Sequence, residues 1–523
     1  MIVSSGWPAN IWNRTDHVFS TSRRVLVVLG LISIARLAVA ALYPPLDDEA
    51  YYWTWARHLA WGYPDHPPMI AYVVRATTAL AGDTAFGIRL GPTLLALGTS
   101  VLLGDLVRRM FNPAAGAAAG IWSQLIPVLS LSAVFAAPDA PLGLFWFLTL
   151  WCFWHALTSG RILAWLATGV ALGLALMSKL PAVFLAVALP AFLLTSPVHR
   201  RWLWRPELYL AAVAALVVLP LIVWNTQHHW LLVRKSSNPA PWTELGSWGL
   251  NLLSYTVAQL GYYGPVAFVL LLLALATAVR WARRGDPRFA LAAWAGIPII
   301  ALTWLGSFQG ISKPHWAGPG YLVALIPGTA LWTELRARRI WRVVVGAALA
   351  LNILIIVALH AFPLRPTPSL AGELWGWDQV ASRLEADLHA TPSNRGVFVF
   401  TPSYQSAAQI EYHTRGRVLV TTLNPQDAIG IRRAPETFAG WNAIFATDAI
   451  PLPVPLALEC REVQRLPALE VTYNGQVVRR FSIYRCSDFR PLPPLATEPQ
   501  QIPRVRGCRT VPVLHSLRCL QSQ

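Results

Sequence analysis

The first long apolar run of the chain, residues 25–43, reads VLVVLGLISIARLAVAALY and is followed closely by the acidic turn Asp47-Asp48-Glu49. A helix that crosses a bilayer needs roughly 20 apolar residues, so this run is long enough to span. It is too long and begins too late for a cleaved secretion signal, and no small-residue cleavage site follows it. We therefore expect a retained transmembrane helix that ends beside three acids.

Similar apolar runs recur along the chain as far as residue 362. We expect further spans near residues 86–106, 114–134, 140–158, 162–178, 180–196, 208–224, 254–279, 289–306, 317–333 and 343–362. Hydrophobic residues are 55% of the 523 residues and charged residues only 13%, which leaves too few polar side chains to cover several soluble domains. The sequence predicts an α-helical polytopic membrane protein with about 11 transmembrane helices, although 162–178 and 180–196 lie so close together that they could form one bent element.

The basic residues are arranged by loop. The net charge is +17, and arginines cluster in every second loop, at positions 14, 23, 24, 108, 109, 161, 200, 201, 205, 280, 283, 284, 288, 336, 338, 339 and 342. This alternation is the positive-inside pattern, so residues 1–24 and the clustered loops are expected in the cytoplasm. The positive charge therefore reflects the orientation of the chain in the membrane, and we expect it to face anionic lipid headgroups rather than nucleic acid.

The chain changes character after residue 362. Prolines at 363, 366 and 368 predict a stiff linker, and residues 363–486 predict a small α/β domain on the outer, periplasmic side. Its expected elements are a strand at 396–400, a helix at 403–413, strands at 417–421 and 441–447, and a hairpin of 469–473 with 476–484 around Asn474-Gly475. Residues 487–523, rich in proline, predict a poorly ordered tail.

The cysteines fit an oxidising outer compartment. Cys152 lies within a predicted span, whereas Cys460, Cys486, Cys508 and Cys519 lie in the outer part. A bridge between Cys460 and Cys486 and a pair of buried free thiols are both compatible with the sequence. No CxxC motif occurs, so a structural zinc site of that kind is not expected.

The predicted outer loops, 44–85, 135–140, 225–253 and 307–316, carry the polar residues of interest. Asp47, Asp48 and Glu49 repel one another near low dielectric, which raises at least one pKa and suits a general base or a metal site. The alternative is an N-cap for the helix that follows. Asp139 has the same ambiguity at the start of its span, where capping is the competing explanation.

Basic and aromatic residues mark the other outer loops. Lys179 has no acid near it in the sequence, and it can either reach the interface or bind a lipid phosphate. The pairs His228-His229 and Arg234-Lys235 follow in the next loop, and Ser312-Lys313-Pro314-His315-Trp316 in the one after. Cations beside indoles suit an anionic headgroup. Adjacent histidines on a helix point in different directions, so a metal shared by His228 and His229 is disfavoured.

Several short motifs occur in an order that is familiar. They are Asp48-Glu49-Ala50-Tyr51-Tyr52-Trp53, Asp65-His66-Pro67-Pro68, Phe86-Gly87-Ile88-Arg89-Leu90, Pro138-Asp139-Ala140-Pro141, Ser178-Lys179 and, in the outer domain, Tyr404-Gln405 to Glu411-Tyr412. Over roughly residues 25–320 the chain resembles the C-type membrane glycosyltransferases. It is most similar to the bacterial branch of glycosyltransferase family 39, akin to protein O-mannosyltransferases, aminoarabinose transferases of lipid A and galacturonosyltransferases of rhizobial lipopolysaccharide.

The resemblance implies an enzyme of the bacterial inner membrane. Such enzymes move a sugar from a polyprenyl-phosphate carrier to an acceptor hydroxyl on the outer face, usually with inversion, and the acceptor is lipid A or another glycolipid, a glycan or a protein. No nucleotide or soluble cofactor is required, and a divalent ion, Mg²⁺ or Mn²⁺, could sit among Asp47, Asp48 and Asp139.

The resemblance also implies roles for individual residues. Asp48 matches the general base, Glu49 supports it, and Asp139 matches the acid that orients the acceptor or a metal. Lys179, Arg89 and His66 are expected to neutralise the lipid phosphate, and Asp47 leaves the identity of the base ambiguous by one residue. Further contacts with substrate or metal are expected from Asp65, His228, His229 and His315.

Two other functional classes compete. A transporter or flippase for a lipid-linked sugar would place ionisable groups near mid-bilayer and show repeated halves, whereas these acids lie at outer helix ends. A non-catalytic scaffold with a glycan-binding outer domain has no use for three adjacent acids. We therefore expect an enzyme.

Overall fold

The computed structural model describes residues 22–236, 248–310, 312–361, 373–422, 435–448 and 456–491, together with residues 508–510 and 517–519. The chain divides into two compact units, residues 1–365 and 366–523. The sequence placed this boundary after residue 362. Each unit is described by itself.

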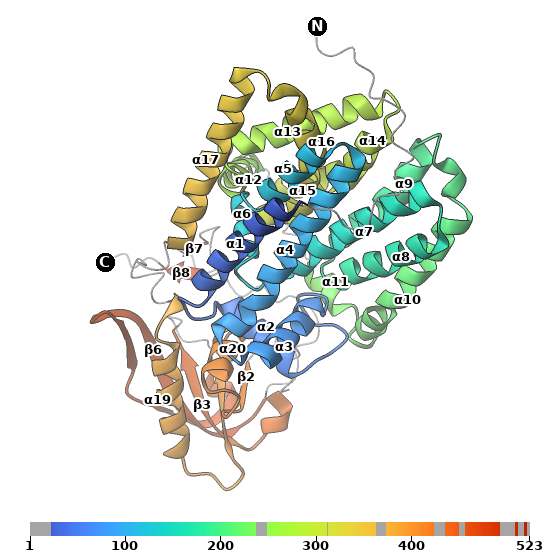
Figure 1. The fold of residues 1–523 in the computed structure, drawn as a ribbon. Helices are drawn as coiled ribbons and strands as arrows, with labels where there is room; N and C mark the ends of the chain where they lie inside the picture. Colours follow the sequence, from blue (N-terminus) through green and yellow to red (C-terminus); the bar gives the residue numbers. More distant parts are fainter. Residues whose placement is uncertain are drawn as a thin grey trace. The chain divides into compact units, whose positions relative to one another are not determined.

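The first unit is helical (Figure 1). Its α-helices are α1 (Arg23–Ala40), α2 (Asp47–Arg57), α3 (Met69–Ala81), α4 (Ala85–Met110), α5 (Pro113–Ser123), α6 (Pro127–Ser132), α7 (Asp139–Ser159), α8 (Ile162–Leu176), α9 (Ala182–Thr195), α10 (Arg205–Gln227), α11 (Leu231–Ser236), α12 (Trp248–Tyr263), α13 (Pro265–Ala282), α14 (Pro287–Ser307), α15 (Gly318–Val323), α16 (Leu325–Leu335) and α17 (Arg339–Ala361). Short 3₁₀ turns η2 (Arg200–Trp202) and η4 (Pro314–Ala317) connect them.

Among the described residues, six helices are long and apolar enough to cross a membrane: Ala85–Met110, Asp139–Ser159, Pro206–Gln227, Pro265–Ala282, Pro287–Ser307 and Arg339–Ala361. Shorter apolar helices cover Met69–Ala81, Ile162–Leu176 and Ala182–Thr195. The prediction of a mostly helical membrane protein with a small sheet domain is confirmed. The number of eleven spans stays a prediction.

Three of the predicted spans are interrupted. Ala324 separates α15 from α16 within the span expected at 317–333, and the other two breaks share one contact. The span expected at 114–134 is divided into α5 and α6, and the single span expected at 254–279 is wrong, because Gly264 separates α12 from α13 with a φ of 81°. One side chain serves both breaks: Asn352 Nδ2 donates to the carbonyl oxygens of Leu125 (2.9 Å) and Tyr263 (3.1 Å). A backbone carbonyl freed inside an apolar unit needs such a donor, so these breaks are built into the fold.

Glycines bring neighbouring helices close together. A Cβ on Gly116 of α5 would lie 2.5 Å from the carbonyl oxygen of Gly104 on α4, and one on Gly169 of α8 would lie 2.6 Å from that of Leu210 on α10. Small residues at helix contacts are typical of membrane bundles, where close backbone packing replaces the hydrophobic effect as the source of association.

The second unit is an α/β domain. It contains α19 (Trp377–His389), β1 (Val397–Thr401), α20 (Tyr404–His413), β2 (Val420–Thr422), η6 (Pro435–Phe438), β3 (Asn442–Thr447), α22 (Leu456–Glu459), β4 (Cys460–Arg465), β5 (Leu469–Tyr473) and β6 (Gln476–Phe489). The sheet has the order β2-β1-β3-β6-β4, with β5 also paired to β6. The strands β7 (Cys508–Thr510) and β8 (Leu517–Cys519) form a separate antiparallel pair.

The local predictions for this domain are largely confirmed. The strands β1 and β2 are parallel and flank α20, as the predicted βαβ unit requires, and Asn474 and Gly475 turn the β5–β6 hairpin with positive φ angles. No strand was predicted at β4, and β6 runs to Phe489, into the segment expected to be poorly ordered. Most of the remaining predicted tail, including 492–507, lies outside the described residues.

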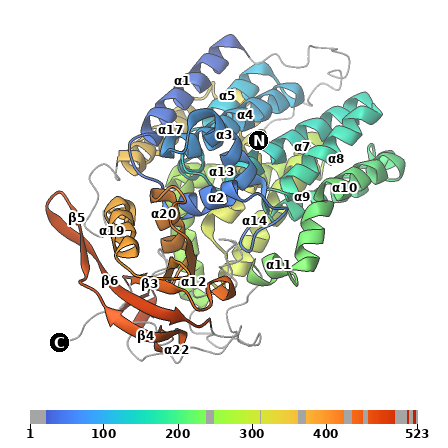
Figure 2. The ribbon, with the colours of Figure 1, turned by 90° about the horizontal axis from the view of Figure 1, so that it is seen from below.

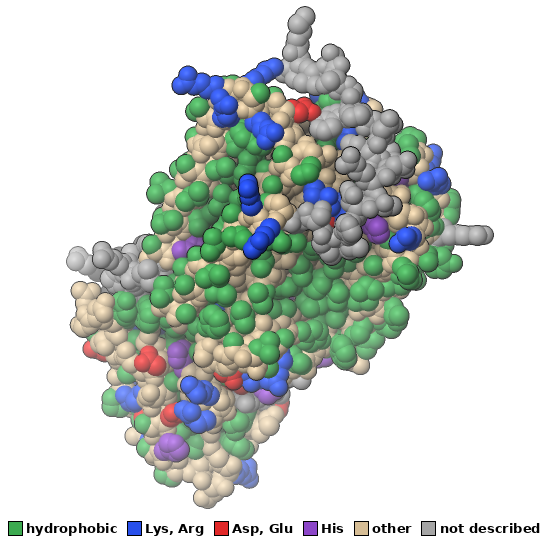
Figure 3. Space-filling model, in the orientation of Figure 1, with side chains coloured by type: hydrophobic (Ala, Val, Ile, Leu, Met, Phe, Trp, Pro, Cys, Tyr) green, Lys and Arg blue, Asp and Glu red, His purple; other side chains and the backbone are tan. Residues whose placement is uncertain are grey.

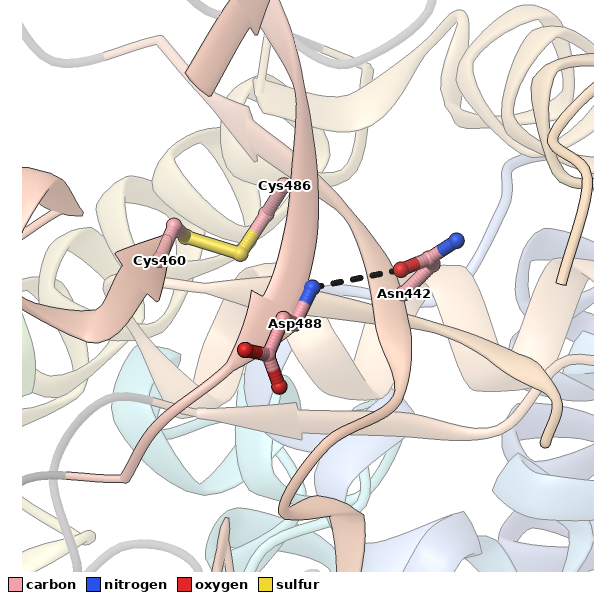
Figure 4. The surroundings of a disulfide bond; sticks show 4 residues. All are labelled: Asn442, Cys460, Cys486 and Asp488. Carbon is pink, nitrogen blue, oxygen red and sulfur yellow. Dashed lines mark hydrogen bonds between the residues drawn. A yellow bond between two sulfur atoms is a disulfide. The ribbon is translucent and has the colours of Figure 1, made fainter. Parts of the chain in front are cut away.

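The open question about the cysteines is answered in the same sheet. Cys460 of β4 and Cys486 of β6 form a disulfide (Figure 4). On the neighbouring strand pair, the backbone N–H of Asp488 donates to Asn442 Oδ1 at 3.2 Å. The bridge therefore ties β4 to the strand that also pairs with β3.

Candidate active site

The acidic turn forms the first turn of α2. Its N-cap is Leu46, whose backbone N–H donates to Glu49 Oε2 at 3.0 Å, so neither Asp47 nor Asp48 is the capping residue. Negative charge at a helix N-terminus is favoured by the helix dipole, which stabilises the acids in this position. In Figures 1 and 2, α2, α3 and α11 gather at one end of the helical unit.

Glu49 is a structural residue in this arrangement. It is fully buried, pairs with Arg89 of α4 (Nε to Oε1, 2.9 Å) and accepts a hydrogen bond from the backbone N–H of Ala136 at 2.8 Å. These contacts join α2, α4 and the loop before α7 around a single carboxylate. Glu49 thus supports the position of its neighbour Asp48.

The structure does not fit the prediction that Arg89 binds the lipid phosphate. Its side chain is 0% exposed, and besides Glu49 it donates to the carbonyl oxygens of Ala40 (2.9 Å), Tyr43 (2.8 Å) and Pro44 (2.9 Å). A guanidinium has five N–H donors, and these contacts use all of them. Arg89 instead fixes the end of α1 against α2 and α4.

Lys179 and Asp139 form a pair that the sequence alone did not predict. The ammonium of Lys179, between α8 and α9, lies 2.8 Å and 2.7 Å from the two carboxylate oxygens of Asp139, at the start of α7. The Lys179 side chain is 6% exposed, so the ion pair is well shielded from water. Asp139 is the first residue of α7 and makes no capping hydrogen bond, which removes the capping explanation.

Asp65 is also paired. Its Oδ2 accepts from the Tyr51 hydroxyl at 3.2 Å, and its Oδ1 lies 2.7 Å from Nζ of Lys235 on α11. The loop that carries it is fixed by Tyr63, which stacks on Trp55 with ring centroids 4.2 Å apart. Asp65 therefore links α2 to α11.

Two histidines belong to the same group of charges. His66 and His315 both interact with the Lys179–Asp139 pair and with Lys313. Burial, followed by the nearby Lys179, lowers the pKa of His66 to about 3 and that of His315 to about 4. Both imidazoles are therefore neutral near pH 7, and His66 does not contribute the positive charge that the sequence assigned to it.

Asp48 differs from the other acids of the turn. Its side chain is exposed, and it has no hydrogen-bond partner among the described residues. Surrounding protein and the neighbouring charge of Asp47 raise the pKa of Asp48 to about 6, while Lys313 acts in the opposite direction. A carboxylate with this pKa is ionised at neutral pH and remains basic enough to accept a proton.

Lys313 was not among the site residues predicted from the sequence. It is exposed, precedes η4, and has no ion-pair or hydrogen-bond partner among the residues that the structure describes. Its charge acts on Asp48, His66 and His315. The segment is held by Gln259 of α12, which donates to the carbonyl oxygen of Pro314 at 3.0 Å. The Lys-Pro-His-Trp motif, a cation beside an indole, is the sequence feature that could have indicated Lys313 as a site residue.

Two other predicted site residues, His228 and His229, make no hydrogen bond or ion pair with the charged group above in the described part of the chain. His228 bonds through Nδ1 to the carbonyl oxygen of Trp224 at 2.8 Å and stacks on the same indole, and His229 is exposed with a φ of 51°. Within the described residues no group of three or more His, Cys, Asp or Glu side chains has the arrangement of a metal site. Both oxygens of Asp139 already accept hydrogen bonds from Lys179, so a cation bound there would lie beside that ammonium charge.

Comparison with known proteins agrees with this architecture. The family model of dolichyl-phosphate-mannose-protein mannosyltransferases matches residues 65–224, which include Asp139 and Lys179 but neither Asp48 nor Lys313. Among solved structures, that of ArnT from Cupriavidus metallidurans bound to undecaprenyl phosphate aligns with a TM-score of 0.59 at 16% identity, over 89% of this chain and 98% of that one. The fold is therefore similar to that of ArnT.

Two curated relatives are similar in sequence. The lipid A galacturonosyltransferase RgtD of Rhizobium johnstonii is 32% identical over 289 residues, which are 54% of this chain and 59% of the relative. An undecaprenyl phosphate-alpha-4-amino-4-deoxy-L-arabinose arabinosyl transferase of Pseudomonas fluorescens is 31% identical over 185 residues, 32% of each chain. The matches thus span about three fifths and one third of these relatives, and the resemblance to this group that the motifs indicated is confirmed.

Proposed function

We propose that the chain is an integral membrane glycosyltransferase that moves a sugar from a polyprenyl-phosphate carrier to an acceptor hydroxyl on the outer face of the bacterial inner membrane. One observation carries this proposal: the charge of Lys313, which has no ion-pair or hydrogen-bond partner among the described residues, acts on the Asp48 carboxylate, whose pKa is raised, and on His66 and His315 beside the shielded Lys179–Asp139 pair. This transfer needs a base that accepts the proton of the acceptor hydroxyl and a cation that stabilises the leaving phosphate, and this group of residues contains both.

The reaction that this geometry supports is a direct displacement. The acceptor hydroxyl gives its proton to the Asp48 carboxylate while its oxygen forms a bond to the anomeric carbon of the donor sugar. The bond between that carbon and the phosphate oxygen breaks, and the lipid phosphate leaves with the electron pair. Attack from the face opposite the phosphate inverts the anomeric configuration.

The positive charge for the departing phosphate is best supplied by Lys313. Arg89 has no donor left, and His66 and His315 are neutral near pH 7. Lys179 holds Asp139 in place through two of its three N–H groups, which leaves one for a phosphate oxygen. We assign Lys313 as the main phosphate ligand and Lys179 as the residue that positions Asp139.

The relatives indicate the substrate class. The names of two of them specify lipid A and an undecaprenyl-phosphate-linked amino sugar, and ArnT of similar fold binds undecaprenyl phosphate. We propose an undecaprenyl-type lipid phosphate sugar as donor and lipid A or a related glycolipid as acceptor. Glycan and protein acceptors are the alternatives that the assay below distinguishes.

The test is a transfer assay with the purified protein in detergent. It combines radiolabelled polyprenyl-phosphate sugars with lipid A, other extracted glycolipids, glycans and protein acceptors, and follows label in the acceptor. We expect transfer from the lipid carrier and none from nucleotide sugars. Label that moves across reconstituted vesicles without reaching any acceptor would instead establish the transporter alternative.

A further inference from the structure

A second feature of the helical unit lies away from the acidic turn. An apolar, partly open cavity of about 110 Å³ is lined by α13, α16, α17, the end of α5 and the residues that follow it. Its walls include Trp122, Gly328, Leu335 and Trp341, and Asn352 is the polar residue in its lining. A void of this size between helices is large enough for part of a hydrocarbon chain.

The cavity has a defined direction. Leu335, the last residue of α16, and Trp341, in the first turn of α17, mark one end, and Asn352 marks the other. At 1.5 Å per helical residue, the path from Trp341 to Asn352 is about 17 Å long. One leaflet of a hydrocarbon core about 30 Å thick is of nearly the same length. The lining therefore matches one acyl chain of a single leaflet.

The open turn between α16 and α17 carries the charge. Close to Leu335 and Trp341 in the sequence stand four exposed arginines, and none of them has an ion-pair partner among the described residues: Arg336, Arg338, Arg339 and Arg342. Figure 3 shows Lys and Arg side chains gathered at this end of the helical unit, opposite the end with α2 in Figure 1. Unpaired cations beside an apolar slot complement a lipid with an anionic head.

We propose that this turn and cavity form a binding site for one anionic phospholipid of the arginine-bearing leaflet. Its phosphate accepts charge-assisted hydrogen bonds from the arginines of the turn, and one acyl chain lies along α16 and α17 as far as Asn352. The site is separate from the group around Asp48, so it does not depend on the proposed transfer reaction.

Native mass spectrometry of the full chain tests the site. The purified protein is equilibrated with mixed vesicles of phosphatidylglycerol and phosphatidylcholine in equal amounts, and retained lipids are counted. We expect one tightly retained phosphatidylglycerol, with a preference over phosphatidylcholine that falls at least about tenfold in Arg336→Gln/Arg338→Gln/Arg339→Gln.

Two further variants distinguish lipid binding at this site from nonspecific attraction of anionic lipid to arginine-rich loops. Arg280→Gln/Arg283→Gln/Arg284→Gln removes the same charge from another arginine loop that does not line the cavity, and it should keep the bound lipid. Gly328→Leu places a side chain in the slot, where an added Cβ lies 3.3 Å from Ala274 Cβ, and should reduce occupancy with no change in charge. Equal retention of both lipids by the unaltered protein, or equal losses in the two arginine variants, would overturn the proposal.

Discussion

At the scale of single residues, Asp48 is distinguished by its pKa of about 6. Below that pH the carboxyl is protonated and cannot accept the hydroxyl proton, so transfer should decline as the pH falls through about 6 and be fully present above it. Desolvation is the largest cause of this raised pKa and the charge of Asp47 the second, so Asp47→Asn should move the acidic limb part of the way to lower pH. The measurement is kcat/KM from pH 4.5 to 8.5; a limb that Asp47→Asn leaves in place would remove Asp47 from this role.

Glu49 and Arg89 should affect stability more than chemistry. Glu49→Gln leaves a buried guanidinium without its counter-charge, which costs about 3–5 kcal/mol in buried pairs. We expect a clearly lower thermal unfolding midpoint in detergent, whereas Asp48→Asn, at an exposed position, should unfold near the temperature of the unaltered protein. Similar midpoints for the two variants would contradict the structural role of Glu49.

Lys313 should act on the reaction itself. Lys313→Ala removes a preorganised positive charge from the leaving phosphate, an effect on the order of 10²-fold in turnover. Lys235→Ala is the matched control, because its ammonium is paired with Asp65. The single-turnover rate of sugar transfer is measured for both variants at a saturating donor concentration. Equal rates for the two alanine variants would exclude Lys313 as the phosphate ligand.

The sequence revealed the acids of the site but not how they are paired. Asp48, Asp139 and Lys179 are recognisable from short motifs; in the structure Asp139 contacts Lys179, and the charge of Lys313 acts on Asp48. The Lys179–Asp139 contact joins residues 40 positions apart, so no local pattern contains it. For the same reason Arg89 was predicted to bind phosphate, since its carbonyl partners belong to the end of another helix.

At the scale of elements, the break at Gly264 is the feature that hydropathy missed. Residues 254–279 are mostly apolar, and the carbonyl oxygen of Tyr263 beside the break accepts a hydrogen bond from Asn352, a single polar side chain about ninety positions away in the sequence. By contrast, the β5–β6 hairpin was predictable because Asn474-Gly475 specifies its turn locally.

Substitution at Gly264 tests whether the break is required. Its φ of 81° with ψ of 134° is accessible to glycine and costs other residues about 1–3 kcal/mol, and an added Cβ would collide with Asn352 Oδ1. Gly264→Ala should therefore lower the unfolding midpoint. Gly261→Ala, on α12, adds a Cβ with nothing within 4 Å and should leave the midpoint unchanged. Comparable midpoints in both variants would mean that the helices can join.

At the scale of the whole molecule, the account depends on which side of the membrane each end of the helical unit faces. Cysteine substitution tests this, with Trp61→Cys near α2 and Arg338→Cys at the arginine turn, both at exposed positions. An impermeant maleimide applied to intact spheroplasts should label position 61, and position 338 only after permeabilisation. The reverse pattern would place the acidic turn in the cytoplasm and exclude transfer at the outer face.

The most direct test of the central claim compares Asp48→Asn with Asp47→Asn in transfer from a polyprenyl-phosphate sugar at pH 8. If Asp48 accepts the hydroxyl proton, its variant should lose transfer by 10²-fold or more, about the contribution of a general base, while donor binding is kept and Asp47→Asn remains active. Turnover by Asp48→Asn at the rate of the unaltered protein would contradict the account.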